Sequence, residues 1–383
     1  MKIAFLIYSL SGGGAERQLS YVLSYCSQNN IKAHLVLMNT TIKYKLPENT
    51  KLHFLEKSRS NENGFIKALK IPLLAYKYSR LLKLLEITHS VSMLSRPNFI
   101  NILAKRLTSH KFYTITNELA FPSLQYSYMG FQSKFNKTLI NWLYKKSDLI
   151  IANSRGNMQD LIDNFSVPKN KITVVNNPID LEKIRKIYQL EDYFDNNYFN
   201  LFSLGRLEIG KNHEMLITAL HELNNPRLRL YIMGEGPLKN YLKEVIDRLN
   251  LGNQIFMLGF DPNPFKYLKS SDLFIFGSNH EGFPNVLLEA MACDLPILST
   301  NCKSGPSEIM ELKNDNEFDI MITDYGILVP IKNASLMSKG IKYFLENEKF
   351  RETCIKNGKR RIKDFEKNHI LKQYVEAIKS ILD

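Results

Sequence analysis

Short apolar runs alternate with longer segments of helical periodicity along the first half of the chain. Continuous apolar runs are typical of strands buried on both faces, and helices repeat their apolar positions every three and four residues. On this basis the sequence predicts strands at Ile3–Tyr8, Ala33–Met38, His53–Leu55, Phe112–Ile115, Leu149–Ala152 and Ile172–Val175. It predicts helices at Ala15–Cys26 and Met158–Asn164, and a longer helical pattern over Phe65–Leu85 that Pro72 interrupts.

The same alternation begins again in the second half. Strands are expected at Phe199–Leu204, Leu228–Met233, Ile255–Leu258, Leu273–Phe276, Pro296–Ser299 and Gly326–Val329, and helices at His213–His221, Lys239–Leu249, Phe265–Lys269 and Asn285–Cys293. Strands that alternate with helices form parallel sheets covered on both faces. The sequence therefore predicts two doubly wound α/β domains, residues 1–177 and 178–364. Ligands of such sheets bind at the carboxyl ends of the strands, so we expect the site in the cleft between the two domains.

The charge of the chain is unevenly distributed. The 383 residues include 51 Lys and Arg against 38 Asp and Glu, a net charge of +13. Residues 1–190 hold 27 basic and 11 acidic residues, whereas residues 191–383 hold 24 and 27. The first half therefore favours an anionic partner, which can be nucleic acid, an anionic membrane or a phosphorylated substrate. A basic surface that serves only solubility is the alternative.

Targeting and cysteine signals are weak. No apolar stretch is long enough to cross a membrane, and a strand followed by a glycine-rich turn explains the N-terminus better than a signal peptide. The four cysteines form no C-x-x-C pair, which argues against a disulfide framework or a zinc site and fits a reducing compartment.

Two glycine-containing motifs follow the first strand of each half. Ser11-Gly12-Gly13-Gly14-Ala15-Glu16-Arg17 can place backbone N–H groups on a phosphate, although Arg17 stands where a dinucleotide fingerprint needs its third glycine. Gly205-Arg206-Leu207-Glu208-Ile209-Gly210-Lys211-Asn212 resembles a P-loop, but Asn212 lacks the hydroxyl that would bind magnesium. Arg206 and Lys211 could still neutralise a diphosphate without metal. The alternatives are a plain tight turn and two solvated surface charges.

Two further motifs follow later strands. Gly234-Glu235-Gly236-Pro237 could let the backbone approach a flat ring or a ribose, or be a turn with a solvated Glu. The segment from Asn279 to Ala290 contains Glu281 in a predicted loop and Glu289 inside the next helix, with Pro284 expected at the first helical position. The N–H groups that follow Pro284 are orphan donors suited to an anion. Paired carboxylates at this spacing can also be purely structural.

Taken together and in this order, these motifs resemble those of family 4 retaining glycosyltransferases, and the resemblance covers almost the whole chain. It implies the GT-B fold, two facing Rossmann-like domains with a cleft between them, and a final helix at 365–383 that returns to the first domain. The stretches Phe5–Leu10, Ser95–Asn98 and Lys303–Pro306 are similar to N-acetylgalactosaminyltransferases that act on undecaprenyl-diphosphate-linked sugars.

The resemblance implies roles for individual residues. Arg206 and Lys211 would bind the donor diphosphate, Glu281 would orient the donor sugar, and Glu289 would hold the ribose. Many relatives carry a histidine near the sugar where this chain has Thr116-Asn117-Glu118, and Glu118 is the catalytic candidate in its place. The remaining donor-binding candidates are Gly14, Gly205, Gly234, Glu235, Gly282, Phe283, Pro284, Asn285 and Val286. The acceptor-binding candidates are Gly12, Gly13, Arg17, Arg96 and Asn117.

The expected reaction moves a hexose-type sugar, N-acetylgalactosamine or a related N-acetylhexosamine, from its UDP derivative to a lipid-diphosphate-linked saccharide in bacterial glycan assembly. We expect no cofactor and no metal, because protein cations and a helix N-terminus would stabilise the leaving diphosphate. No carboxylate pair is placed as in a hydrolase, which favours same-face attack with retention. The alternatives are a GT-B nucleotide-sugar epimerase and a basic nucleic-acid-binding protein, although no nucleic-acid motif is present.

The segment Lys57–Lys83 indicates that the basic first half of the chain contacts an anionic membrane. Apolar residues are interleaved there with many cations and a single acid, Glu62, as in a helix that lies on an anionic leaflet. Besides Lys57 and Arg59, these cations are Lys67, Lys70, Lys77, Arg80 and Lys83. The expected location is therefore the cytoplasmic face of the inner membrane, in peripheral association. A helix with one core face and one solvated face is the alternative.

Overall fold

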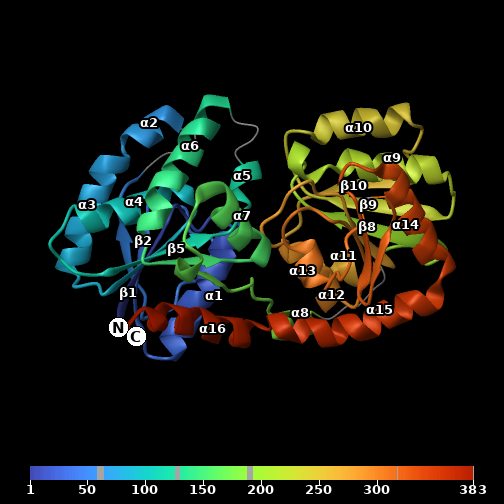
Figure 1. Cartoon of the computed structure of the whole chain (residues 1–383). Coiled ribbons are helices and arrows are strands. Elements are labelled where there is room, and N and C mark those ends of the chain that lie inside the picture. The colour runs from blue at the N-terminus through green and yellow to red at the C-terminus, as the bar shows by residue number, and fades with distance from the viewer. Residues whose placement is uncertain (58–63, 126–129, 188–192, 317, 383) are drawn as a thin grey trace. The chain divides into compact units, whose positions relative to one another are not determined.

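The computed structural model describes residues 1–57, 64–125, 130–187, 193–316 and 318–382 (Figure 1). Arg59 and Glu62 of the expected membrane segment lie outside these ranges. The chain forms two compact units. Unit 1 comprises Met1–Pro178 and Lys367–Asp383, and unit 2 comprises Ile179–Glu366.

Unit 1 is built on a parallel sheet of seven strands in the order β3-β2-β1-β4-β5-β6-β7. The strands are β1 (Lys2–Ile7), β2 (Lys32–Leu37), β3 (Lys51–Phe54), β4 (His89–Met93), β5 (Tyr113–Glu118), β6 (Leu149–Ala152) and β7 (Ile172–Val174). The helices are α1 (Gly14–Gln28), α2 (Gly64–Leu69), α3 (Ile71–Leu84), α4 (Ser95–Arg106), α5 (Pro122–Gln125), α6 (Gly130–Leu143), α7 (Arg155–Phe165) and α16 (Lys367–Lys379). A short 3₁₀ turn, η1 (Tyr144–Lys146), precedes β6.

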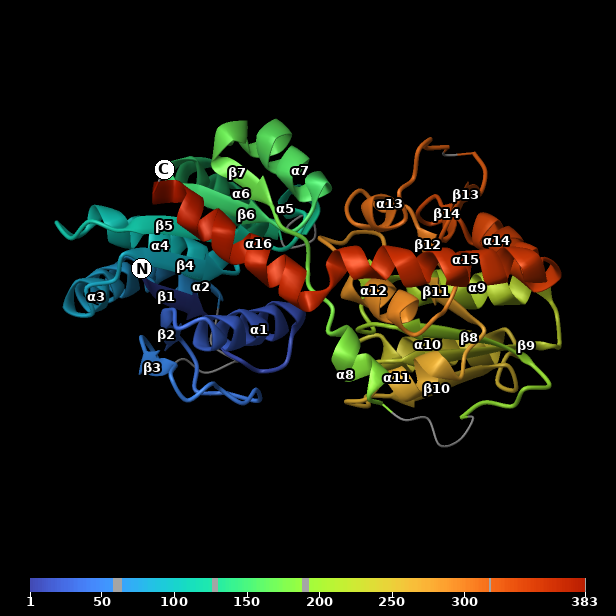
Figure 2. The ribbon, with the colours of Figure 1, turned by 90° about the horizontal axis from the view of Figure 1, so that it is seen from below.

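Alternate side chains of each strand in unit 1 enter two different cores, because successive residues of a strand point to opposite faces. Ala4 and Leu6 of β1 pack with α3, α4, α6 and α7. Phe5 of the same strand packs with α1 and α16 on the other face. The C-terminal helix α16 therefore completes the core of unit 1 beside α1 (Figure 2).

Unit 2 repeats this plan. Its sheet has the order β10-β9-β8-β11-β12-β14-β13, with only β13 antiparallel. The strands are β8 (Phe199–Leu204), β9 (Leu228–Met233), β10 (Ile255–Gly259), β11 (Leu273–Phe276), β12 (Ile297–Thr300), β13 (Met321–Thr323) and β14 (Gly326–Val329). The α-helices are α8 (Leu181–Arg185), α9 (His213–Leu223), α10 (Lys239–Arg248), α11 (Phe265–Lys269), α12 (Asn285–Ala292), α13 (Pro306–Ile309), α14 (Ala334–Glu346) and α15 (Glu348–Arg361). The 3₁₀ turns used below are η3 (Ile209–Lys211) and η4 (Ile362–Phe365).

The predicted α/β class with two parallel sheets is confirmed, but the sequence missed several elements of unit 1. Strand β4 reads His-Ser-Val-Ser-Met, and its His89, Ser90 and Ser92 are all buried. The burial is tolerated because Asn101 of the equally unpredicted α4 accepts a hydrogen bond from Ser90 and donates one to Ser92. Buried polar groups that are paired in this way mask the apolar pattern of a core strand.

Two predicted boundaries also change. The pattern over Phe65–Leu85 forms two helices that meet at Lys70, since Pro72 has no N–H to continue the first helix. Thr116–Glu118 belong to β5 rather than to the loop after it, so Glu118 is the last residue of that strand.

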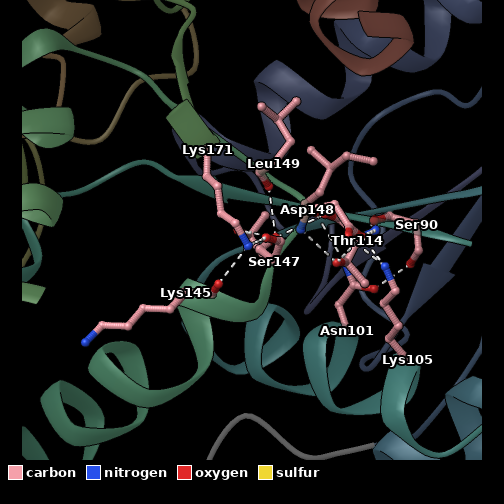
Figure 3. Close-up of polar contacts among 11 residues, drawn as sticks. Ser90, Asn101, Lys105, Thr114, Lys145, Ser147, Asp148, Leu149 and Lys171 are labelled. Carbon is pink, nitrogen blue, oxygen red and sulfur yellow. Dashed lines mark hydrogen bonds and ion pairs between the residues drawn. The ribbon is translucent and has the colours of Figure 1, made fainter. Parts of the chain in front are cut away.

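A polar cluster fixes the opposite, amino end of β5 (Figure 3). Asp148, just before β6, accepts hydrogen bonds from the backbone N–H and the hydroxyl of Thr114, at 2.7 and 2.8 Å. Lys105 of α4 pairs with the same carboxylate at 2.5 Å. Lys171 donates to the carbonyls of Lys145 and Ser147, at 2.8 and 3.0 Å. The cluster sets the register of β5 against β6 at the end of the sheet away from Glu118.

Candidate active site

Four neighbouring parallel strands of unit 2, β9, β8, β11 and β12, end at one edge of the sheet, and the predicted donor motifs follow them directly. Gly205 follows β8, Gly234 follows β9, and the segment that contains Glu281 follows β11. Because the strands are parallel, residues far apart in the chain meet at this edge.

The structure joins two predicted site residues that lie 70 positions apart in sequence. The ammonium of Lys211, in η3, contacts the Oε1 atom of Glu281 in an ion pair that is also a hydrogen bond. Both side chains are mostly shielded, with 22% of Lys211 and 12% of Glu281 exposed. The ammonium also lies 5.6 Å from the ring centre of Phe276, at the end of β11. Because this carboxylate and this ammonium are already in contact and shielded from water, each can form hydrogen bonds with a polar ligand with little reorganisation of the site.

Two histidines that the sequence analysis did not single out border Lys211. Burial, together with the charge of Lys211, lowers the pKa of His213 to about 4. Burial is also the main cause that lowers the pKa of His280, and Lys211 adds to it against the opposing charges of Glu281 and Glu208. Both rings are therefore neutral near pH 7, and Lys211 carries the positive charge of this cluster. In the sequence, His213 lies two residues after Lys211 and His280 directly precedes Glu281. This proximity was the signal that could have identified both histidines.

The glycines of these motifs are required because the loops pack closely against one another. A Cβ atom on Gly234, which has a φ of 151°, would lie 1.9 Å from the carbonyl oxygen of Gly205. A Cβ on Gly236 would lie 2.4 Å from the oxygen of Leu207, and one on Gly210 would lie 2.7 Å from the His280 ring. The contacts that fix these three glycines are therefore within the protein, although the sequence suggested that Gly234 and Gly236 let the backbone approach a ligand.

Helix α12 begins at Asn285, as its predicted range has it, but Pro284 is not the first helical residue that the sequence suggested. Pro284 is the N-cap, with a ψ of 103°, and Asn285 is the first helical residue. Asn285 and Val286 are partly exposed, whereas Gly282, Phe283 and Pro284 are buried. The hydroxyl of Ser304 donates to the carbonyl of Gly282 at 2.6 Å and holds the loop before the helix.

The side chains of the other donor-binding candidates differ in their exposure to solvent. Glu289, inside α12, is only 3% exposed. Arg206 points outward with 76% of its side chain exposed, and its nearest acid is Glu208 at 3.5 Å. Glu235 is half exposed and pairs with Lys239 at 2.8 Å. Arg206 therefore has the freedom to meet a ligand, whereas Glu289 lies in the core beneath the loop.

In unit 1, helix α1 begins in an exposed glycine loop. Gly12, Gly13 and Gly14 are all exposed, Gly12 has a φ of 120°, and Gly13 is the N-cap without a side chain to cap the helix. Arg17 lies in the first turn and donates its backbone N–H to Gly13. The backbone of this loop is exposed and Arg17 adds one cation, but the Glu16 carboxylate lies close to Gly13, and the anion-binding role of the loop stays a prediction.

Glu118 lies in a different environment at the end of β5. It is 5% exposed, accepts a hydrogen bond from the Tyr144 hydroxyl at 2.9 Å, and accepts two more from the N–H groups of Leu119 and Ala120. Burial raises the pKa of Glu118 to about 7 in spite of these donors. The carboxyl group is thus held inside unit 1 by neutral donors, and its catalytic role stays a prediction.

Two acceptor-binding candidates are engaged in internal contacts. Asn117 is 1% exposed; its amide nitrogen donates to Ser92, and its oxygen accepts from the Tyr374 hydroxyl of α16 at 2.8 Å. Arg96 donates to the Lys67 carbonyl and lies 3.2 Å from Glu56. These contacts connect elements of unit 1, and the acceptor roles of both residues stay predictions.

The outer face of α2 and α3 is apolar as well as basic. Leu69, Leu73, Tyr76 and Leu84 are 50 to 78% exposed, while Ile71, Leu74, Tyr78 and Leu82 face the core. Lys77, Arg80 and Lys83 are exposed beside them, whereas Lys70 pairs with Glu56 at 3.1 Å. This arrangement differs from a helix with one core face and one solvated polar face. Within the described part of the chain, no helix is long and apolar enough to span a bilayer.

Comparison with known proteins places the chain in a family. Residues 12–183 match the family described as Glycosyltransferase Family 4, and residues 189–361 match Glycosyl transferases group 1. The N-acetylgalactosamine-N,N'-diacetylbacillosaminyl-diphospho-undecaprenol 4-alpha-N-acetylgalactosaminyltransferase of Campylobacter jejuni is 41% identical over 381 residues, which cover 100% of this chain and 99% of the relative.

Solved structures show the same fold. HepE of Anabaena in complex with UDP and glucose superposes with a TM-score of 0.77 at 21% identity, over 99% of this chain and 100% of that chain. Sucrose-phosphate synthase of Thermosynechococcus elongatus gives 0.82 at 15% identity, over 100% and 99%. The fold is thus that of the GT-B glycosyltransferases. The chain belongs to glycosyltransferase family 4.

Proposed function

We propose that this enzyme transfers N-acetylgalactosamine from UDP-N-acetylgalactosamine to a saccharide carried on undecaprenyl diphosphate. The observation that carries the proposal is the end-to-end similarity to a Campylobacter jejuni enzyme whose name specifies this sugar and this lipid carrier. A second relative from the same organism, 25% identical over 347 residues, is named for a transfer of the same sugar to a shorter lipid-linked acceptor.

The edge of the unit 2 sheet suits the donor. Lys211 and the exposed Arg206 supply positive charge for the diphosphate, and the N–H groups of the partly exposed residues at the start of α12 can donate hydrogen bonds to a phosphate oxygen. Glu281 would exchange part of its contact with Lys211 for hydroxyl groups of the sugar. Glu289 would act from beneath by holding the ribose.

Transfer requires stabilisation of the charge that grows on the departing UDP. Lys211 and Arg206 would interact more strongly with the leaving diphosphate than with the bound donor, which lowers the barrier. The acceptor hydroxyl would form its bond to the anomeric carbon on the face from which UDP departs, and its proton would pass to the leaving phosphate oxygen. The configuration would be retained, without a covalent intermediate and without metal.

The acceptor would be reached from an anionic membrane surface. The exposed apolar residues of α2 and α3, with Lys77, Arg80 and Lys83 beside them, form a face that can insert side chains among headgroups while the cations meet lipid phosphates. A lipid-diphosphate substrate is confined to that surface. The enzyme would therefore act in peripheral association with the cytoplasmic face of the membrane.

A panel of nucleotide sugars tests the proposal directly. The full chain is incubated with each donor and a synthetic polyprenyl-diphosphate saccharide, and the products are read by mass spectrometry and by the anomeric proton couplings in NMR. We expect a single N-acetylhexosamine addition with UDP-N-acetylgalactosamine and an α-linkage. Transfer from another nucleotide sugar alone, or a β-linkage, would contradict the donor or the stereochemical assignment, respectively.

A further inference from the structure

Unit 2 contains a cavity of about 720 Å³ that none of the donor motifs line. Its walls come from α8, from the residues at the end of α11, from the C-terminal end of α12 and from α15 with η4. The side chains that give it charge are Arg185, Lys269, Lys359 and Lys363, against the single acid Asp294.

Two of these four cations are held in place by contacts within the protein. The Lys269 ammonium donates to the carbonyls of Ile184 and Ile187, at 3.3 and 2.7 Å, which fixes it at the wall formed by α8. Lys359 lies 3.1 Å from Asp294, and both side chains are about half exposed. Asp294 therefore offsets one of the four charges.

The other two cations, Arg185 and Lys363, have no hydrogen-bond or ion-pair partner among the residues that the structure describes. Both side chains are exposed. After the Lys359–Asp294 pair is taken into account, three positive charges border one cavity. Their mutual repulsion opposes this arrangement in the empty protein and would be relieved by an anion.

Compensation of the α12 dipole does not explain this excess of charge. The negative end of a helix attracts cations, but the effect is worth at most a fraction of one charge. The last carbonyls of α12 already accept hydrogen bonds: that of Ala290 from Cys293 and Leu295, and that of Met291 from Asp294. The helix end is thus capped by the chain itself, and the additional cations remain available to a ligand.

We propose that this cavity is a second anion site, and that it takes a soluble compound with a phosphate or diphosphate group. Guanidinium and ammonium groups are the usual protein partners of phosphate oxygens. The volume is in the range of small-molecule sites, and Leu181, Met291 and Ile362 line it with apolar surface for the rest of the compound. A concave site of this kind suits a free molecule better than a flat lipid headgroup layer.

The position of the cavity gives occupancy a structural consequence. α8 follows the point where the chain enters unit 2, and η4 precedes the point where it leaves; the two segments are joined by a 2.9 Å hydrogen bond from Ile179 to Phe365. A phosphate bound between Arg185, Lys363 and Lys269 would connect α8 and η4 to the core of unit 2. Binding should therefore raise the thermal midpoint of unfolding.

The test is calorimetric titration of the full chain with inorganic pyrophosphate, in a Lys211→Met background that removes the main cation of the donor motifs. In this background, Arg185→Gln with Lys363→Gln should weaken binding at least tenfold and abolish the rise of the thermal midpoint. The matched control is Lys243→Gln with Lys349→Gln, which removes two exposed charges of unit 2 elsewhere. Equal affinity in the two double variants, or no saturable binding at all, would overturn the proposal.

A parallel arm distinguishes a soluble ligand from a lipid headgroup. Sedimentation with phosphatidylglycerol vesicles should be the same for the two double variants. Loss of vesicle binding in the Arg185/Lys363 variant, with an unchanged pyrophosphate titration, would instead assign these cations to a membrane contact and contradict the proposed site. Neither arm uses sugar transfer as a readout, so the outcome is independent of the proposed function.

Discussion

Glu118 and Glu281 are both carboxylates at the carboxyl edge of a parallel sheet, one in each unit, but their surroundings differ in kind. Glu281 is in contact with the ammonium of Lys211 in a partly open loop. Glu118 is buried at the end of β5, where a tyrosine hydroxyl and two backbone N–H groups are its partners and burial raises its pKa to about 7.

The difference shows how the same residue type serves two purposes. A carboxylate that is paired with a cation can share that cation with a ligand, whereas burial without a cation favours the protonated form of Glu118, even though its three donors favour the charged form. On this comparison we propose donor chemistry for the edge of unit 2 and a mainly structural role for the end of β5, in place of the catalytic role that the sequence predicts for Glu118.

Replacement of Lys211 by methionine should have the largest effect. It removes the ammonium that would stabilise the leaving diphosphate and leaves Glu281 without its partner, so kcat/KM for transfer should fall by about 10²- to 10³-fold. Steady-state kinetics measures the loss. Lys339→Met breaks an exposed 2.7 Å pair with Asp319 and should leave transfer unchanged. A Lys211→Met enzyme with nearly normal kcat/KM would refute the phosphate-binding role.

Glu118→Gln should change how stability depends on pH. Below about pH 4.3 both the folded and the unfolded chain carry the proton; between that value and the folded pKa of about 7, only the folded protein keeps it. The wild-type free energy of unfolding should therefore fall by about 4 kcal/mol as the pH rises through this window, and the variant should lack this fall. Urea unfolding at several pH values measures it, with the exposed Glu376→Gln as control. If the free energy of unfolding depends on pH in the same way for the wild type and for Glu118→Gln, the raised pKa of Glu118 is excluded.

Charge reversal on the outer face of α3 should weaken membrane binding. Lys77, Arg80 and Lys83 are exposed beside apolar side chains, and each basic residue near an anionic surface contributes about 1 kcal/mol. The triple change to Glu should thus reduce the affinity for phosphatidylglycerol vesicles by at least about tenfold in a sedimentation assay. Lys70→Glu should have a smaller effect per charge, because Lys70 already pairs with Glu56. If the triple change leaves vesicle binding unaltered, the outer face of α3 is excluded as the membrane contact.

Tyr374→Phe should have the smallest effect, a modest loss in the free energy of unfolding. The variant removes the 2.8 Å hydrogen bond from α16 to the buried Asn117 and leaves its oxygen with one donor fewer, at a cost of about 1 to 2 kcal/mol in the free energy of unfolding. Tyr343→Phe is the control, since no hydrogen bond of its hydroxyl is found among the described residues. Equal stability of the two variants would show that the contact contributes little.

How well the sequence predicts the fold depends on what each strand buries. Strands β8, β9 and β11 have the bounds that the sequence predicts, because apolar residues predominate in them. Strand β4 is missed because it buries polar residues, and its two serines are satisfied by Asn101, which lies in another element. Such pairing depends on tertiary structure and leaves no periodic signal.

Prediction of the candidate site from the sequence is limited in the same way, because the contacts between its residues depend on tertiary structure. Lys211 and Glu281 are identified by residue type and motif, but their direct contact depends on β8 lying next to β11, and local patterns do not specify strand order. Likewise, Glu118 is found by its position after an apolar run, whereas its burial depends on Tyr144, which is distant in sequence.

We propose that the carboxylate of Glu281 in unit 2, and not that of Glu118 in unit 1, serves the transfer reaction. Transfer of N-acetylgalactosamine to the lipid-diphosphate saccharide should therefore be measured for Glu281→Gln and Glu118→Gln in one assay at pH 7, with equal thermal midpoints verified beforehand. We predict that Glu281→Gln lowers kcat/KM by about 10²-fold and that Glu118→Gln stays within about tenfold of wild type. The reverse order of the two losses would contradict the account.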